Sequence, residues 1–316
     1  MRGRLAKIAA WVVTLALLGW LFWRTPFSQV LTAMRTAAPW TLPVGVAGFI
    51  GIYLADSFAM WKTFGWFLAK LSYGQILLVR GATYLLAAIN YNVGQGAIVY
   101  FIHRATGAPV MRGVATVLLI MGINVLALLF LASTGLIIAP DSPHSLYLII
   151  GIAYAGLAVY ILMVAIRPRW LATRPIFDVL LAAGLGGHVR ALLVRLPHIA
   201  VLIAFQALMQ RGFGVQIPLI QAVICLPVVL FVAVLPISVQ GLGTTQAAMV
   251  FFFARYAPGD RSAQEAAVLA ASLVAQFLGL ICQVVVGLFC VRSRAGRELQ
   301  NASRDSAAAT GPASPA

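Results

Sequence analysis

The sequence predicts an all-α polytopic membrane bundle of two inverted repeats, each with three spans and a re-entrant helical hairpin. Of its 316 residues, 62% are hydrophobic and only 9% are charged, against roughly 25% charged residues in soluble domains. Most apolar runs reach the roughly 20 residues that a helix needs to cross a hydrocarbon core. Two other apolar stretches are interrupted by similar glycine-containing signatures, at residues 92–96 and 239–246.

Six apolar runs are predicted to be membrane spans. The first follows a basic start and lacks a small-residue cleavage site before Arg24, so we expect an uncleaved anchor. The fifth is short and contains Pro197. The predicted spans are Ile8–Trp23, Trp40–Trp61, Gly113–Ala139, Ser145–Ile166, Leu196–Gln210 and Glu265–Val291.

Each glycine signature lies between two apolar arms that are shorter than a full crossing, which favours re-entrant hairpins. Glycines with polar neighbours expose backbone groups that lipid cannot satisfy. Such backbone occurs at membrane depth only where protein buries it or where it lines a wet cavity. The arms are Ser72–Ile89 and Ala97–Thr106 in the first hairpin, and Gln216–Leu235 and Ala247–Tyr256 in the second.

Two further stretches, Pro26–Ala37 and Pro175–Arg195, have apolar residues at helical spacing and are predicted to be interfacial helices. The order span, interfacial helix, span, hairpin, span then occurs twice, over about residues 8–139 and 144–291. Because three spans precede the second repeat, it is inverted; matched interrupted segments of this kind point to a midplane binding site in transporters. Residues 1–292 form one predicted transmembrane domain, and 293–316 a mostly disordered cytoplasmic tail.

The formal net charge of +15 comes from 22 basic and 7 acidic residues. The basic residues flank the apolar runs, as topology signals do, so we expect anionic membrane lipids as partners and no nucleic acid. Both termini are predicted to be cytoplasmic, because most of the basic residues then lie inside. The basic residues left outside are Arg24, Arg35, Arg211, Arg255 and Arg261.

The few acidic and histidine residues show no catalytic or metal-binding pattern. Catalysis needs a nucleophile or metal with an aimed acid or base. The sequence has no HExxH motif, no closely paired carboxylates and no nucleophile elbow. We therefore expect no catalytic residue, no metal and no cofactor.

Asp56 is the one acid that we place in the interior of a predicted span, since Glu265 lies at the first residue of the sixth span. Charged residues there are costly and are usually paired or functional, and Arg80 or Arg104 of the first hairpin could pair with it. Alternatively, Asp56 lies near the inner end of the span, close to Lys62, and merely reaches the water interface. Both interpretations remain open.

The hairpins also carry arginines, whose guanidinium groups match phosphate geometry. They could hold an anionic lipid headgroup, or they could be ordinary topological and snorkelling residues. Polar residues at the tips either bind substrate or only satisfy the broken backbone. The candidate substrate-binding residues are Asp56, Arg80, Gly94, Gln95, Gly96, Arg104, Arg211, Gly241, Gly243, Thr244, Gln246 and Arg255.

The segment Leu235–Ala247 resembles the Pro-Ile-Ser-x-x-Gly-x-Gly-x-x-Glu-x pattern of the lysylphosphatidylglycerol synthase transmembrane family, the flippase-like domain. Residues 92–104 and 265–273 are similar to two further regions of that family, and the resemblance covers roughly residues 5–292. It implies a bacterial inner-membrane domain that moves aminoacylated or other polar lipids between leaflets. Two departures stand out. Gln95 and Gln246 lie where the family often has an acid, and no soluble synthase domain follows Val291, so no aminoacyl transfer is implied.

Three functional hypotheses follow. The first is a flippase-like transporter of a polar or anionic lipid, which polar access at the hairpin tips would favour. The second is a non-catalytic membrane partner of a lipid- or glycan-modifying enzyme, which a packed dry seam would favour. The third is an intramembrane enzyme, which a buried acid–histidine or metal cluster would favour.

The charge layout predicts that residues 140–144 face outward and residues 167–174 face inward. A cysteine introduced at Ser142 should therefore react with a membrane-impermeant maleimide added outside intact cells. A cysteine at Thr173 should stay unlabelled until the membrane is permeabilised. Labelling of Ser142→Cys only from the cytoplasmic side would contradict the inverted-repeat arrangement.

Overall fold

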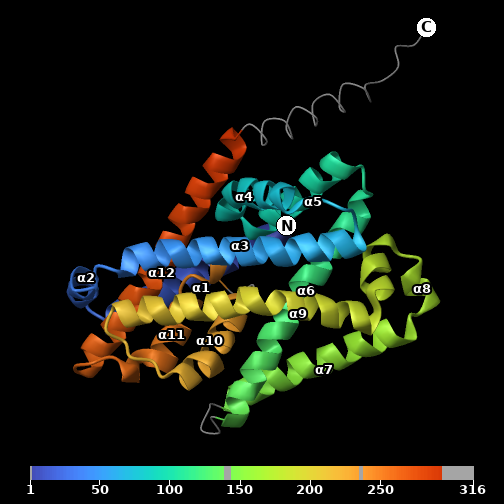
Figure 1. Ribbon diagram of the computed structural model, residues 1–316. Helices are drawn as coiled ribbons and strands as arrows, with labels where there is room; N and C mark the ends of the chain where they lie inside the picture. The colour runs from blue at the N-terminus through green and yellow to red at the C-terminus, as the bar shows by residue number, and fades with distance from the viewer. Residues whose placement is uncertain (1, 139–143, 235–237, 294–316) are drawn as a thin grey trace. The chain divides into compact units, whose positions relative to one another are not determined.

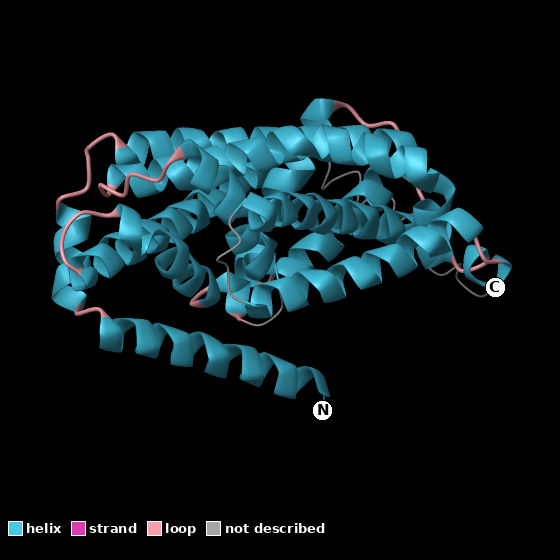
Figure 2. Cartoon of the chain, turned by 90° about the horizontal axis from the view of Figure 1, so that it is seen from below, coloured by secondary structure: helices cyan, strands magenta, loops and turns pink. Residues whose placement is uncertain are grey.

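The computed structural model describes residues 2–138, 144–234 and 238–293. Within these ranges the chain consists of helices joined by short connections, without strands (Figure 1, Figure 2). The all-α fold class is therefore confirmed. The predicted outer loop at residues 140–143 lies outside the described residues, as does the predicted tail except for Ser293.

Four helices in the described part of the chain are long and apolar enough to cross a membrane. They are α3 (Thr41–Phe67), α6 (Val110–Ile138), α9 (Pro175–Gly212) and α12 (Arg261–Arg292). Shorter apolar stretches lie in α1 (Arg2–Arg24), α7 (His144–Ile166) and α10 (Leu219–Val234). The six predicted spans lie along α1, α3, α6, α7, α9 and α12. The inverted-repeat arrangement and the re-entrant geometry stay predictions.

The helices form two compact units, each assembled from three separate stretches of the chain. Unit 1 contains residues 1–52, 125–157 and 196–279, and unit 2 contains residues 53–124, 158–195 and 280–316. The long helices α3, α6, α7, α9 and α12 contribute residues to both units.

In unit 1, the short amphipathic helix α2 (Phe27–Arg35) packs on α1 and on the first half of α12. Val30 is buried against Leu21 and Leu269, and the partly exposed ring of Phe27, one turn earlier, lies 5.8 Å from that of Phe22 on α1. The predicted helix at Pro26–Ala37 is thus present. The remaining elements of unit 1 are the single turn η1 (Val239–Gly241), α11 (Thr244–Phe253), which packs on α10, and η2 (Ala254–Tyr256).

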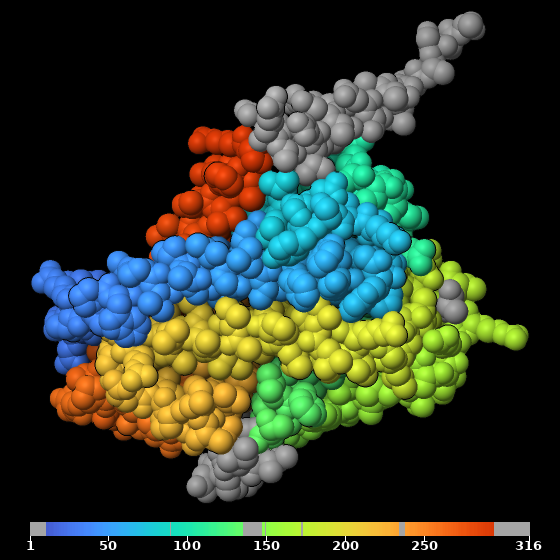
Figure 3. All heavy atoms as spheres, viewed as in Figure 1, coloured from blue at the N-terminus to red at the C-terminus, as the bar shows by residue number. Residues whose placement is uncertain are grey.

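Small residues let α3 and α9 approach closely in unit 1. A Cβ atom at Gly48 would lie 2.7 Å from Cδ2 of Phe205, and one at Gly51 would lie 3.2 Å from Val201. Figure 3 shows the two helices side by side, α3 in blue and α9 in yellow. Glycine at such positions permits the close backbone contact that is common between helices in membranes.

Unit 2 contains a hairpin formed by α4 (Tyr73–Ile89) and α5 (Tyr91–Thr106), which pack against each other. A capping box of Ser72 and Gln75 begins α4. Asn90 ends α4 and also begins α5, because its side-chain oxygen accepts hydrogen bonds from the first N–H groups of α5. The short helix α8 (Arg169–Ala172) also belongs to this unit.

The core of unit 2 joins this hairpin to α3 and α6. The buried side chains at its centre are Met60, Phe64, Ile76, Val79, Ile98, Val99, Ile102 and Val117. Burial of such aliphatic and aromatic side chains stabilises the packing by about 1.5–3 kcal/mol each.

The first glycine signature is not the backbone break that the sequence predicted. Residues 92–96 lie within α5, and the extended residue is Asn90, at φ −154° and ψ 121°. Gly94 serves close packing instead: a Cβ atom there would lie 2.6 Å from Cβ of Ala87 on α4. A glycine adopts helical backbone angles without difficulty, so the signature does not by itself interrupt a helix.

The second signature does break the backbone, as predicted. Gln240 has a φ of 51°, and Gly241 and Gly243 have φ values of 73° and 86°. These angles fall in the left-handed region, where glycine avoids the steric cost of a Cβ atom. The chain therefore turns sharply between η1 and α11.

The predicted boundary between an interfacial helix at Pro175–Arg195 and a span at Leu196–Gln210 is also wrong. Both segments belong to α9, whose non-helical residue is Gly184, with a φ of 58°. The amphipathic pattern has a protein partner, since Phe177 and Leu181 pack against Val164 of α7. Apolar spacing therefore marked a helix–helix contact.

The two glycines of the first signature should respond oppositely to alanine. Gly94→Ala brings a Cβ atom within 2.8 Å of the Ala87 Cα atom, so overpacking should destabilise the protein by about 1–3 kcal/mol. Gly96 has open space around its Cα, so Gly96→Ala should stabilise α5 by about 0.5–1 kcal/mol. The thermal unfolding midpoints of both variants in detergent test this, and equal midpoints would contradict the packing described for Gly94.

Candidate functional site

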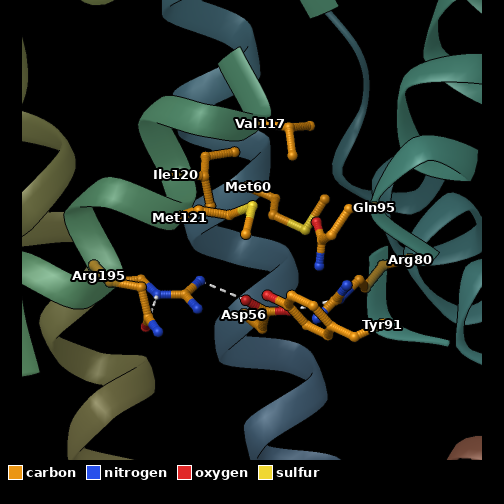
Figure 4. Close-up of a pocket in the computed structure, with 10 residues that line it drawn as sticks. Asp56, Met60, Arg80, Tyr91, Gln95, Val117, Ile120, Met121 and Arg195 are labelled. Atoms are coloured by element: carbon orange, nitrogen blue, oxygen red, sulfur yellow. Dashed lines mark hydrogen bonds and ion pairs between the residues drawn. The ribbon is translucent and has the colours of Figure 1, made fainter. Parts of the chain in front are cut away.

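Asp56 lies at the centre of a buried charge cluster in unit 2 (Figure 4). Nε of Arg80, on α4, lies 2.6 Å from its Oδ2 atom. Arg195, on α9, donates a hydrogen bond from Nη1 to the Oδ1 atom of the same carboxylate. One acidic side chain on α3 therefore joins arginines from two other helices.

Side-chain hydrogen bonds to backbone carbonyl groups fix α4 beside α3 and so place Arg80. Trp61 donates to the carbonyl of Leu71 at 2.8 Å, and Tyr53 donates to that of Leu77 at 2.6 Å. Tyr84 follows Arg80 by one helical turn, and its ring lies 4.9 Å from the guanidinium carbon. Arg80 is thus held between a carboxylate and an aromatic face, an arrangement that favours a cation.

Arg195 is held by a second acceptor. Its Nε atom donates to Oδ1 of Asn124, on α6, at 3.1 Å. The guanidinium plane is therefore fixed by two neighbours on different helices. The planar guanidinium group is preorganised for such paired contacts, so little side-chain entropy is lost for each hydrogen bond.

A small cavity lies beside the cluster. Its volume, counted over the positions that the centre of a water molecule can occupy, is ≈ 30 Å³. A cavity of this volume accommodates about two water molecules. Tyr91, 48% exposed, is its most exposed lining residue and marks the open side. The lining residues are Asp56, Met60, Arg80, Tyr91, Gln95, Val117, Ile120, Met121, Asn124 and Arg195.

The cluster carries an excess positive charge. Two guanidinium groups share a single carboxylate, and the lining residues include no other acid. The side chains of Asp56, Arg80 and Arg195 are only 3%, 15% and 9% exposed, so solvent screens this charge weakly. An uncompensated charge in such a place attracts an anion more strongly than it would at a surface.

The second signature forms a separate polar centre in unit 1. Gln246 is fully buried; its Oε1 accepts from the N–H of Gly243 at 2.7 Å, and its Nε2 donates to Gln276 at 2.7 Å. Thr244 donates to the carbonyl of Gly241 at 3.0 Å. Thr14 of α1 accepts from the N–H of Val239 at 2.9 Å. These side chains satisfy the broken backbone, which was one of the two roles left open for them.

The remaining candidates do not join the cavity. Arg104 is half-buried on α5, with its Nε 3.4 Å from the Tyr100 hydroxyl. Arg211 and Arg255 are exposed residues of unit 1, and Arg255 lies over the ring of Tyr256. Of the twelve candidates, the cavity brings together Asp56, Arg80 and Gln95.

Sequence reasoning missed Arg195, Asn124 and Tyr91. Arg195 was assigned to the end of an interfacial helix, where an arginine needs no partner. A usable signal was present, since apolar residues lie on both sides of Arg195, as they do around Asp56. Asn124 and Tyr91 carry no comparable signal, because single polar residues are common in apolar helices.

A comparison with protein-family models decides the relationship of this chain. The model of the lysylphosphatidylglycerol synthase TM region matches residues 7–287. The chain belongs to this family. No curated protein matches the chain. This lysylphosphatidylglycerol synthase TM-region protein is therefore a multi-pass membrane protein, and its long apolar helices agree with that assignment.

Two substitutions in the charge cluster around Asp56 should lower the free energy of unfolding by different amounts. Asp56→Asn leaves two buried guanidinium groups without a counter-ion and should destabilise by about 3–5 kcal/mol. Arg195→Met leaves the neutral pair of Asp56 and Arg80, so its cost should be clearly smaller. Thermal unfolding of the purified protein in detergent measures both, and a larger loss for Arg195→Met would contradict the charge balance described above.

Proposed function

We propose that this protein moves a polar lipid between the two leaflets, with the anionic part of the headgroup held beside Asp56, Arg80 and Arg195. The observation that carries the proposal is the buried, cation-rich cluster and its polar cavity within a membrane domain. Ionisable residues inside membrane domains are expensive and typically mark substrate pathways. Membership of the lysylphosphatidylglycerol synthase TM-region family supports a lipid-related role.

The residues suit a headgroup that must lose water while its acyl chains stay in the bilayer. Guanidinium groups replace the lost water contacts of an anionic oxygen with charge-assisted hydrogen bonds. Opposite them, Met60, Val117, Ile120 and Met121 give the cavity an apolar wall. A lipid therefore meets polar and apolar surfaces at one place.

The hairpin formed by α4 and α5 supplies Arg80, Tyr91 and Gln95, whereas α3, α6 and α9 supply Asp56, Asn124 and Arg195. Movement of the hairpin against these three helices would open and close the site. Alternating access in transporters commonly uses such relative movements around a fixed site. We place both termini in the cytoplasm, following the positive-inside rule.

A second candidate function is a non-catalytic membrane partner of a lipid- or glycan-modifying enzyme. The polar tip in unit 1 favours it, because Thr244 and Gln246 bond to the protein's own backbone and to Gln276. A closed tip of this kind suits a structural role. The two functions differ in whether the protein alone moves lipid.

Reconstitution of the purified full chain into liposomes with a fluorescent anionic lipid tests the proposal. Protected fluorescence after addition of an impermeant reductant reports leaflet transfer, and the wild-type protein should accelerate it. Arg80→Gln and Arg195→Gln should slow transfer by about ten- to a hundredfold, since each removes charge-assisted hydrogen bonds.

The matched control is Arg104→Gln, on the same hairpin but outside the cavity. This variant should transfer lipid at the wild-type rate. Transfer no faster than in protein-free liposomes, or equal rates in the Arg80, Arg195 and Arg104 variants, would overturn the proposal.

A further inference from the structure

The charge and volume of the cavity indicate which chemical class of ligand it would bind. This inference rests on the proposed function. We propose that the cavity binds a singly charged oxyanion of the phosphodiester type and that Gln95 sets this charge preference. The chemical class follows from three observations: the charge of the lining, the way the arginines share one carboxylate, and the neutral amide of Gln95.

The charge of the lining favours one negative charge. Arg80 and Arg195 face a single carboxylate, Asp56, and the other polar lining residues, Tyr91, Gln95 and Asn124, are neutral groups. A ligand with one negative charge brings the site to neutrality. A dianion would leave a negative excess in a weakly screened place, and a cation would add to the existing excess.

The arginines are already arranged around a two-oxygen anion. Arg80 contacts Oδ2 of Asp56 and Arg195 contacts Oδ1, so the two oxygens of one group lie between two guanidinium groups. The two non-ester oxygens of a phosphodiester offer a similar pair of acceptors, and guanidinium binds both kinds of anion in this way. The cavity of ≈ 30 Å³ beside them accommodates these oxygens but not a whole headgroup.

Gln95 keeps the cavity cationic. Figure 4 shows its amide directed into the space beside Asp56 and Arg80. Glutamate has nearly the same shape and would add a second carboxylate at this position. The arginines would then be neutralised without a ligand, and a bound anion would leave the site with a net negative charge.

The test compares Gln95→Glu with Gln75→Glu in the purified full chain. Gln75 is exposed on the same hairpin, and its Oε1 accepts from the N–H of Ser72, a role that glutamate also fills. The probes are short-chain phosphatidylglycerol and inorganic phosphate, each titrated by calorimetry. Gln95→Glu should weaken phosphatidylglycerol binding by about tenfold or more, whereas Gln75→Glu should leave it unchanged.

Two further variants separate the effect of charge on ligand binding from any effect on folding. Gln95→Met changes the side chain without adding charge and should keep the preference for the anionic probe. Asn124→Asp adds a carboxylate next to Arg195 and should reproduce the loss caused by Gln95→Glu. Unfolding midpoints of both acidic variants should equal or exceed that of the wild type, because each adds a counter-ion to the cluster.

The outcomes are distinct. Loss of phosphatidylglycerol binding in both acidic variants supports a lipid headgroup as the ligand, and the same loss for inorganic phosphate alone supports a free anion. Equal binding by wild type and both acidic variants overturns the inference, even if wild-type protein transfers lipid in liposomes. Charge-dependent binding without any lipid transfer overturns the proposed function and leaves the oxyanion site standing.

Discussion

The polar centre of unit 2 depends on one carboxylate. Asp56 separates two guanidinium groups that come from α4 and α9 and would otherwise face each other in a nearly dry interior. Like charges repel strongly where the dielectric constant is low. The placement of this acid on α3 therefore allows both arginines to lie beside the cavity, where together they leave one positive charge in excess.

The polar centre at the second glycine signature and the cluster around Asp56 satisfy buried polar groups in different ways. The signature in unit 1 uses neutral amides and hydroxyl groups, and Gln246 and Thr244 are engaged with the backbone that they support. Unit 2 uses full charges and leaves one positive charge uncompensated among the residues that line the cavity. A saturated polar network stabilises a fold, whereas an unsaturated one keeps binding energy available for a ligand.

The sequence was sufficient for the helical class and the family, because each depends on local composition. It also offered Arg80 as one of two possible partners for Asp56, because a charge in an apolar run is unusual, but it did not decide between Arg80 and Arg104. The sequence was insufficient where two different structures produce the same pattern of apolar residues or glycines. Apolar spacing at Phe177 and Leu181 suits a membrane surface as well as a neighbouring helix, and here it contacts α7. Glycine at position 94 suits a broken backbone as well as a close helix crossing, and here it lies against Ala87.

Asn90 ends α4 and also begins α5, so no further loop residue separates the two arms of the hairpin in unit 2. Close contact between Gly94 and Ala87 joins its two arms just beyond that residue. Arg80 and Gln95 lie one on each arm of this closely packed hairpin. In the proposed function, the cation that attracts the ligand and the amide that sets its preferred charge would therefore move as one unit.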